Sequence, residues 1–171
     1  TTFFIDDKID TGNILFQMKA TIGEDETAGE LHDRLMILGS ELVLKTVKAI
    51  QSEDYETQKQ DETLVTRAPK LYRENCQIDF NQAAHEVFNF IRGLSPYPAA
   101  WTLFEGREVK ILEARKVMEC KTTAAPGSYF ANRKELLYFC SDGAIQVLEL
   151  KPEAKRQMPV QDFLNGFNFN Q

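Results

Sequence analysis

The chain begins with two short apolar segments separated by a polar loop. Residues 1–5 have the composition of a strand, and residues 14–22 alternate apolar side chains with others. A period of two is typical of a strand with one covered face. The loop between the segments ends with Gly12, which is free to adopt positive φ. The pattern predicts an antiparallel pair of strands joined by a tight polar loop.

A longer apolar stripe follows the strand pair. Thr27 stands three residues before Glu30, which is the spacing of a capping box at a helix start. Leucines then recur at helical intervals, at Leu31, Leu35, Leu38 and Leu42. This spacing predicts an amphipathic helix of about six turns that ends near residue 50.

A polar, acidic stretch without periodicity follows the helix, and we interpret residues 51–77 as a linker. A second unit begins near Ile78. Asn81 is a candidate cap for a helix that runs to about Gly93, where glycine would stop it.

The rest of the chain is rich in short apolar runs separated by turn residues. The expected strands are 100–104, 107–117, 128–130, 136–140 and 145–150, with turns at 105–106, 126–127 and 142–143. Pro159 is placed to start a closing helix over 160–167. Short strands at this spacing predict a small barrel with flanking helices, so the fold class is α+β.

The first 50 residues cannot form a core of their own. Two strands and one helix leave the leucine stripe without a covering sheet. Exposure of the four leucines would forfeit roughly 6–12 kcal/mol, at about 1.5–3 kcal/mol each. We therefore expect residues 1–50 to be the tail of a larger α/β domain.

Composition places the chain among ordinary globular proteins. It has 171 residues, of which 43% are hydrophobic and 27% charged, and this excludes a disordered, collagen-like or coiled-coil chain. The net charge of −6 comes from residues 1–77, which hold 15 acidic and 9 basic side chains. The remainder is neutral, so bulk charge gives little support for non-specific nucleic-acid binding.

The cysteines and histidines exclude several kinds of site. Cys76, Cys120 and Cys140 form no Cys-x-x-Cys pair, so we interpret them as reduced thiols of a cytoplasmic protein. His32 and His85 lie 53 positions apart, which argues against a His-rich metal site, and we expect no metal. No apolar run approaches the roughly 20 residues of a bilayer span, so we expect no membrane partner.

The loop before the second strand is the strongest chemical candidate. Three carboxylates, Asp6, Asp7 and Asp10, precede Gly12 within a few positions. A carboxylate held beside a reacting amine can orient water or transfer a proton. The same residues are also typical of a solvated turn whose carboxylates cap backbone amides, and composition alone leaves both interpretations open.

A resemblance bears on this choice. The run Ile9-Asp10-Thr11-Gly12-Asn13-Ile14-Leu15 resembles the catalytic Asp loop of the 10-formyltetrahydrofolate-dependent formyltransferases. Four further segments are similar to the methionyl-tRNA formyltransferases, in that family's order and approximate spacing: 27–35, 68–71, 78–80 and 91–101. The match covers nearly the whole chain and weakens after Trp101.

The resemblance implies an organisation and an activity. Residues 1–50 would end the Rossmann-like formyltransferase domain, residues 51–77 would be the interdomain linker, and residues 78–171 would form the OB-like C-terminal tRNA-binding domain. Asp10 would be the catalytic aspartate, which the family uses together with an Asn and a His. The family's reaction serves translation initiation. Together these three residues pass a formyl group from 10-formyltetrahydrofolate to the amine of initiator methionyl-tRNA. Those partners precede this loop in the family, so we expect the 171-residue chain to be inactive alone.

The same resemblance suggests binding residues. Asp6, Asp7 and Gly12 would contact the folate. Basic side chains that could face the tRNA backbone are Lys70, Arg73, Arg92, Lys110, Lys155 and Arg156. Tyr97 and Trp101 could stack on bases or pack the seam between helix and barrel.

Two other functions stay open. A related formyltransferase or hydrolase could act on a nucleotide-sugar amine or on formyltetrahydrofolate, although the run Ala68-Pro69-Lys70-Leu71 favours the tRNA enzyme. Alternatively, the chain could be a non-catalytic OB-like nucleic-acid-binding module whose first 50 residues bind a partner.

Overall fold

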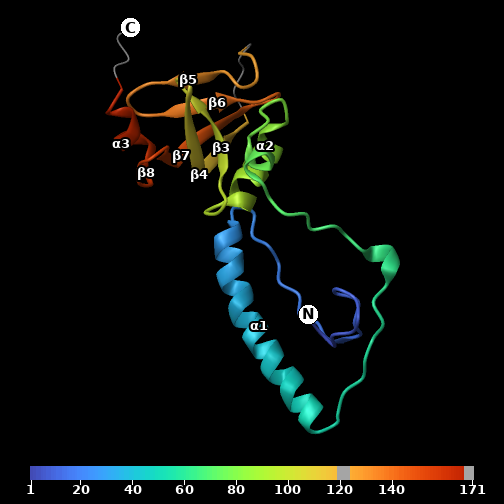
Figure 1. Ribbon diagram of the computed structural model, residues 1–171. Helices are drawn as coiled ribbons and strands as arrows, with labels where there is room; N and C mark the ends of the chain where they lie inside the picture. Colours follow the sequence, from blue (N-terminus) through green and yellow to red (C-terminus); the bar gives the residue numbers. More distant parts are fainter. Residues whose placement is uncertain (119–123, 168–171) are drawn as a thin grey trace. The chain divides into compact units, whose positions relative to one another are not determined.

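A computed structural model describes residues 1–118 and 124–167 (Figure 1). The chain divides into two compact units. The first comprises Thr1–Glu26 and Glu30–Lys70, and the second comprises Thr27–Gly29 and Leu71–Gln171.

The first unit contains the predicted strand pair and most of the predicted helix. Strand β1 (Thr2–Phe3) pairs antiparallel with β2 (Ile14–Phe16), which confirms the pairing. Helix α1 (Ala28–Gln51) begins directly after Thr27, as the capping-box spacing predicts. The prediction of a strand over residues 14–22 is wrong beyond Phe16.

The segment after α1 also carries local structure. Gln58 and Ile14 exchange two backbone hydrogen bonds of 2.8 Å, which adds a bridge beside β2. A short 3₁₀ helix, η1 (Glu62–Leu64), follows, and the Asp61 carboxylate caps it by accepting from the Thr63 N–H at 2.9 Å. A second 3₁₀ helix, η2 (Arg73–Cys76), belongs to the second unit.

In its described residues, the second unit is built on a curled antiparallel sheet of six strands. Its order is β3-β4-β7-β6-β5, and β8 also pairs with β7. The strands are β3 (Ala100–Phe104), β4 (Arg107–Val117), β5 (Tyr129–Ala131), β6 (Leu136–Phe139), β7 (Ala144–Pro152) and β8 (Met158–Pro159). Register shifts interrupt the β4–β7 ladder near Glu113, and such irregularities bend a sheet.

The sequence pattern places most of these strands within one or two residues. It gives the bounds of β3 and β4, and the turn Glu105-Gly106 joins them with both residues at positive φ, as a tight hairpin requires. It misses β8, whose two residues form too short a run to detect. The closing helix α3 (Val160–Leu164) ends three residues before the predicted limit.

Helix α2 (Ala84–Leu94) packs on β4 and the neighbouring strands. The prediction that Asn81 caps it is wrong, because the helix starts at Ala84. The Asp142 carboxylate, 58 positions away, accepts from the Ala84 N–H at 2.7 Å. Gly93 is also not the stop, since the helix continues through Leu94 and Ser95 is the C-cap.

The core of the second unit is continuous. Phe80 stacks on Tyr138 with ring centroids 4.9 Å apart, and the buried Tyr138 hydroxyl donates to the Leu103 carbonyl at 3.0 Å. Helix α2 and strands β3, β4, β6 and β7 all contribute fully buried side chains to this core.

The first unit is different. Its buried apolar side chains are Leu15 and Leu42, whereas Leu35 on the same stripe is 46% exposed. None of the helices in the described part of the chain combines the length and apolar character that a membrane span requires.

Candidate active site

The Asp6–Gly12 loop is closed at its base by the strand pair. The Phe4 N–H donates to the Asn13 carbonyl at 3.0 Å, so the two ends of the loop run side by side. A Cβ atom on Gly12 would lie 1.5 Å from the Phe4 carbonyl oxygen. Gly12 is therefore required for this close approach, and it does not use the positive φ that the sequence suggested.

Asp6 holds the loop from inside. Its carboxylate accepts from the Thr11 hydroxyl at 2.6 Å and from the Lys8 N–H at 3.0 Å. These two hydrogen bonds hold the pKa of the Asp6 carboxyl below its ordinary value, and the bond from Thr11 makes the larger contribution. Asp6 thus organises the loop, while its contact with folate stays a prediction.

Asp10 presents an exposed carboxylate. Its backbone has φ of 60°, in the left-handed region that few residues other than glycine adopt. Among the described residues its carboxylate has no hydrogen-bond partner, and Asp7 is also exposed. The geometry leaves both carboxylates accessible to a ligand.

Gln60 is a residue of this site that the sequence reading missed. Its side-chain Nε2 donates to the Asp10 carbonyl at 2.9 Å and to the Gly12 carbonyl at 2.8 Å. No local pattern marks it, because the contact joins residues about 50 positions apart.

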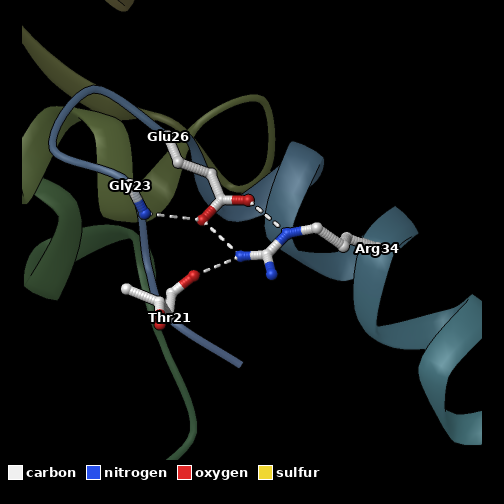
Figure 2. Close-up of polar contacts among 4 residues, drawn as sticks. All are labelled: Thr21, Gly23, Glu26 and Arg34. Atoms are coloured by element: carbon white, nitrogen blue, oxygen red, sulfur yellow. Dashed lines mark hydrogen bonds and ion pairs between the residues drawn. The ribbon is translucent and has the colours of Figure 1, made fainter. Parts of the chain in front are cut away.

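A second polar cluster fixes the chain between β2 and α1 (Figure 2). The Arg34 guanidinium donates to both carboxylate oxygens of Glu26, at 2.9 and 2.8 Å, and to the Thr21 carbonyl at 2.6 Å. Glu26 also accepts from the Gly23 N–H at 3.0 Å. Two-point pairing of this kind gives a defined geometry, so the cluster ties residues 21–26 to α1.

Both histidines lie on helices, His32 on α1 and His85 on α2. His32 is exposed beside the Asp33 carboxylate at 3.1 Å, and His85 is exposed on α2. Within residues 1–118 and 124–167, no group of three or more His, Cys, Asp or Glu side chains is arranged to hold a metal ion.

The described cysteines are buried free thiols, Cys76 and Cys140. Burial, with a smaller contribution from Asp142, raises the pKa of the Cys140 thiol to about 12, so the unreactive protonated form prevails at neutral pH. Cys120 lies outside the described residues.

The predicted basic residues divide into two groups. Lys70 lies in the first unit and is exposed, as are Lys155 and Arg156 in the loop before β8. Arg92 donates to Asn89 on the same helix at 2.8 Å.

Arg73 and Lys110 lie around Trp101. The Arg73 guanidinium lies 4.4 Å from the Trp101 ring centroid and pairs with Glu108. Lys110 is opposite Trp101 in the β3–β4 register, and Lys151, which the sequence reading missed, is opposite Lys110 in the β4–β7 register. Trp101 is 7% exposed and donates its indole N–H to the Arg73 carbonyl at 2.8 Å, so it packs, whereas Tyr97 is 86% exposed.

Comparison with known proteins assigns the chain to a family. The sequence model of the family described as "Formyl transferase, C-terminal domain" matches residues 70–168. This chain belongs to the formyltransferase family. Curated formyltransferase relatives include the methionyl-tRNA formyltransferases of Chlorobium luteolum and Flavobacterium johnsoniae, each 42% identical to it. The alignments cover 98% and 99% of this chain but 54% and 55% of those relatives, so the chain spans about half their length.

Two solved structures share the fold of this chain. HypX from Aquifex aeolicus, solved in complex with tetrahydrofolic acid, superposes with a TM-score of 0.73 at 19% identity, over 98% of this chain and 30% of its own. WlaRD, a sugar 3N-formyl transferase solved with dTDP and 5-N-formyl-THF, gives 0.65 at 19% identity, over 90% of this chain and 54% of its own.

Proposed function

We propose that this chain is the C-terminal part of a methionyl-tRNA formyltransferase, a cytoplasmic enzyme of translation initiation. The reaction would move a formyl group from 10-formyltetrahydrofolate to the amine of initiator methionyl-tRNA. The observation that carries the proposal is 42% identity to enzymes of that name over nearly the whole chain. The exposed Asp10 within its braced loop supports it.

The proposed domain organisation is the one that the resemblance implies. Residues 1–50 would complete a Rossmann-like catalytic domain, residues 51–77 would link the domains, and residues 78–171 would be an OB-like tRNA-binding domain. The apolar side chains exposed on α1 support a larger first domain, because they need a cover: Leu35, Met36, Ile37, Val43, Leu44, Val47 and Ile50.

Asp10 would act on the proton that the reaction must move. As the amine nitrogen bonds to the formyl carbon, the bond from that carbon to the folate nitrogen breaks. The amine must lose a proton and the folate nitrogen must gain one. An exposed carboxylate on a braced loop can hold or pass that proton, with the Asn and His that the family supplies from the preceding part of the protein.

The folate would lie against the same loop. Asp7 is exposed and can accept hydrogen bonds from the pterin, while Gly12 keeps the loop closed against Phe4. Asp6 would act by keeping the loop shape, since its carboxylate already accepts from Thr11 and Lys8.

The tRNA would bind mainly on the second unit. We place the phosphate backbone along Arg73 and Lys110, with Lys151 added from the structure and Arg92, Lys155, Arg156 and the linker's Lys70 as further contacts. Contacts to phosphate weaken as salt rises, so the KM for tRNA should increase steeply with ionic strength.

Replacement of Asp10 tests the proposal directly. In the full-length protein, Asp10→Asn should lower kcat for formylation of initiator methionyl-tRNA by about 10²–10⁴-fold, the range expected for general acid–base catalysis. Asp54→Asn, which alters an exposed carboxylate after α1, is the matched control and should behave as wild type. Near-normal turnover by Asp10→Asn would remove Asp10 from the mechanism.

Sugar formylation is the second candidate, because WlaRD shares the fold over 90% of this chain. Formylation of initiator methionyl-tRNA and of nucleotide-linked amino sugars should be measured side by side with the full-length protein. Faster transfer to the sugar would overturn the tRNA assignment while keeping the family.

A further inference from the structure

The Gln60 side chain joins the segment after α1 to the loop that carries Asp10. One amide nitrogen donates two hydrogen bonds, to the Asp10 carbonyl at 2.9 Å and to the Gly12 carbonyl at 2.8 Å. Both donor hydrogens of the amide are thus directed at one short stretch of backbone. A single side chain holds the carbonyl groups of the two residues on either side of Thr11.

The amide is itself held in place. Two residues earlier, Gln58 exchanges backbone hydrogen bonds of 2.8 Å with Ile14, the first residue of β2. This bridge aligns the segment with the strand that follows the loop. Gln60 is therefore presented to the loop from an anchored backbone, and its side chain is half-buried.

Asp10 needs such support. A left-handed backbone costs free energy for a residue with a side chain, although less for aspartate than for most residues, and it persists where the surroundings hold it. The Asp10 carboxylate projects from this backbone and has no hydrogen-bond partner among the described residues. Its direction is consequently set by the backbone, and the Gln60 amide is the group that holds the Asp10 carbonyl.

Other contacts hold the loop as well. The Phe4 carbonyl lies so close to Gly12 that no side chain fits there, and the Asp6 carboxylate joins the beginning of the loop to Thr11 near its end. Neither of these contacts reaches the Asp10 carbonyl. Among the side chains of the described residues, Gln60 is the one that donates a hydrogen bond to it. Removal of the amide should free that peptide without opening the base of the loop.

We propose that Gln60 is a positioning residue for Asp10, so that the segment after α1 takes part in shaping the active site. The inference rests on the proposed function, because it gives Gln60 a role only if Asp10 is catalytic. Displacement of a reacting group by about 1 Å can cost 10²-fold in rate. Loss of the amide should therefore lower kcat and leave binding of both substrates nearly unchanged.

The experiment uses the full-length protein and the formylation assay with initiator methionyl-tRNA. Gln60→Met keeps the size and flexibility of the side chain but removes both donors, and kcat should fall by about 10- to 100-fold. The KM values should stay within about twofold of wild type, since no substrate contact is removed. Gln58→Met, which preserves the backbone bridge, is the matched control and should retain wild-type kcat.

Two further variants separate positioning from loss of structure. Gln60→Lys restores a donor and should recover part of kcat, whether or not Gln60→Met lowers the melting temperature. Gln60→Met added to Asp10→Asn should have no further effect on kcat, because the amide acts through Asp10.

The outcomes distinguish the inference from the function beneath it. Full activity of Gln60→Met, with Asp10→Asn inactive, would overturn the role of Gln60 and keep that of Asp10. An additive loss in the double variant, or equal losses for Gln60→Met and Gln58→Met, would likewise overturn it. Full activity of Asp10→Asn would instead reject the proposed catalytic residue itself.

Discussion

The two units of this chain differ in how much of their apolar surface they bury. In the second unit, side chains from α2, α3 and the curled sheet enclose a continuous core, with Tyr138, Ile111 and Leu150 fully buried. In the first unit, Leu15 and Leu42 are the buried apolar side chains, and much of α1 exposes apolar surface.

The contrast shows that a segment can form regular secondary structure without contributing to a buried core. Helix α1 has 24 residues and forms where its sequence predicts, yet a helix gains most of its stability from packing of its apolar face. The second unit contains its own packing partners. The first unit buries few apolar side chains, and its polar contacts include the Glu26–Arg34 pair and the Gln60 amide.

Separation of the units should give the largest effect. A protein of residues 71–171 should unfold cooperatively on heating, because its core lies within that range. A peptide of residues 1–70 should show no cooperative transition by circular dichroism. Cooperative unfolding of the shorter peptide would contradict the comparison.

Truncation of one side chain in each unit should give the next largest effect. Leu150→Ala should lower the free energy of unfolding of the second unit by about 2–5 kcal/mol, as is usual for a buried leucine. Leu35→Ala should change the free energy of unfolding of the 171-residue chain by less than about 0.5 kcal/mol, measured by urea denaturation.

The same Leu35→Ala change in the full-length protein sharpens the comparison. If a larger first domain covers α1, the substitution should there cost about 2 kcal/mol or more. An equally small cost in both proteins would show that α1 stays uncovered.

A cap substitution should have a smaller effect. Asp142→Ala removes the carboxylate that accepts from the Ala84 N–H, and the second unit should lose about 1 kcal/mol. Asn81→Ala, at the residue that the sequence favoured as the cap, is the matched control. Its side chain bonds only to Asp79 in the described structure, so a loss equal to that of Asp142→Ala would contradict the assignment.

The last prediction concerns the pH dependence of stability. The Cys140 thiol has its pKa raised from 9.0 to about 12 by burial, so between these values the unfolded chain loses a proton that the folded chain keeps. The free energy of unfolding should fall as pH rises through this window. Burial raises the pKa of Tyr138 as well and acts in the same direction.

Cys140→Ala isolates the contribution of the thiol. Urea midpoints measured from about pH 8 to pH 10.5 should fall less steeply in this variant than in wild type. Parallel slopes would show that the thiol titrates alike in the folded and unfolded chains.

Elements with local signals could be predicted from the sequence. The apolar period places α1, and the Glu105-Gly106 turn with its flanking β-rich runs gives β3 and β4 to the residue. Errors arise where a partner distant in sequence decides. Helix α2 is an example, because the cap on its Ala84 N–H comes from Asp142, 58 positions away.

The candidate site follows the same division. The acidic loop and its glycine are visible in sequence, but the reason for Gly12 is the nearby Phe4 carbonyl, and positive φ belongs to Asp10 instead. Gln60 and Lys151 could not be found, because a hydrogen bond across about 50 residues and a cross-strand register leave no local pattern.

The burial of Trp101 gives the chain an intrinsic fluorescence probe of unfolding. It is the single tryptophan of the sequence, and it lies in the second unit beneath the Arg73 guanidinium. Intrinsic indole fluorescence will therefore follow the second unit, while far-ultraviolet dichroism includes the long helix of the first. A mismatch between the two signals during denaturation would itself measure how independently the halves melt.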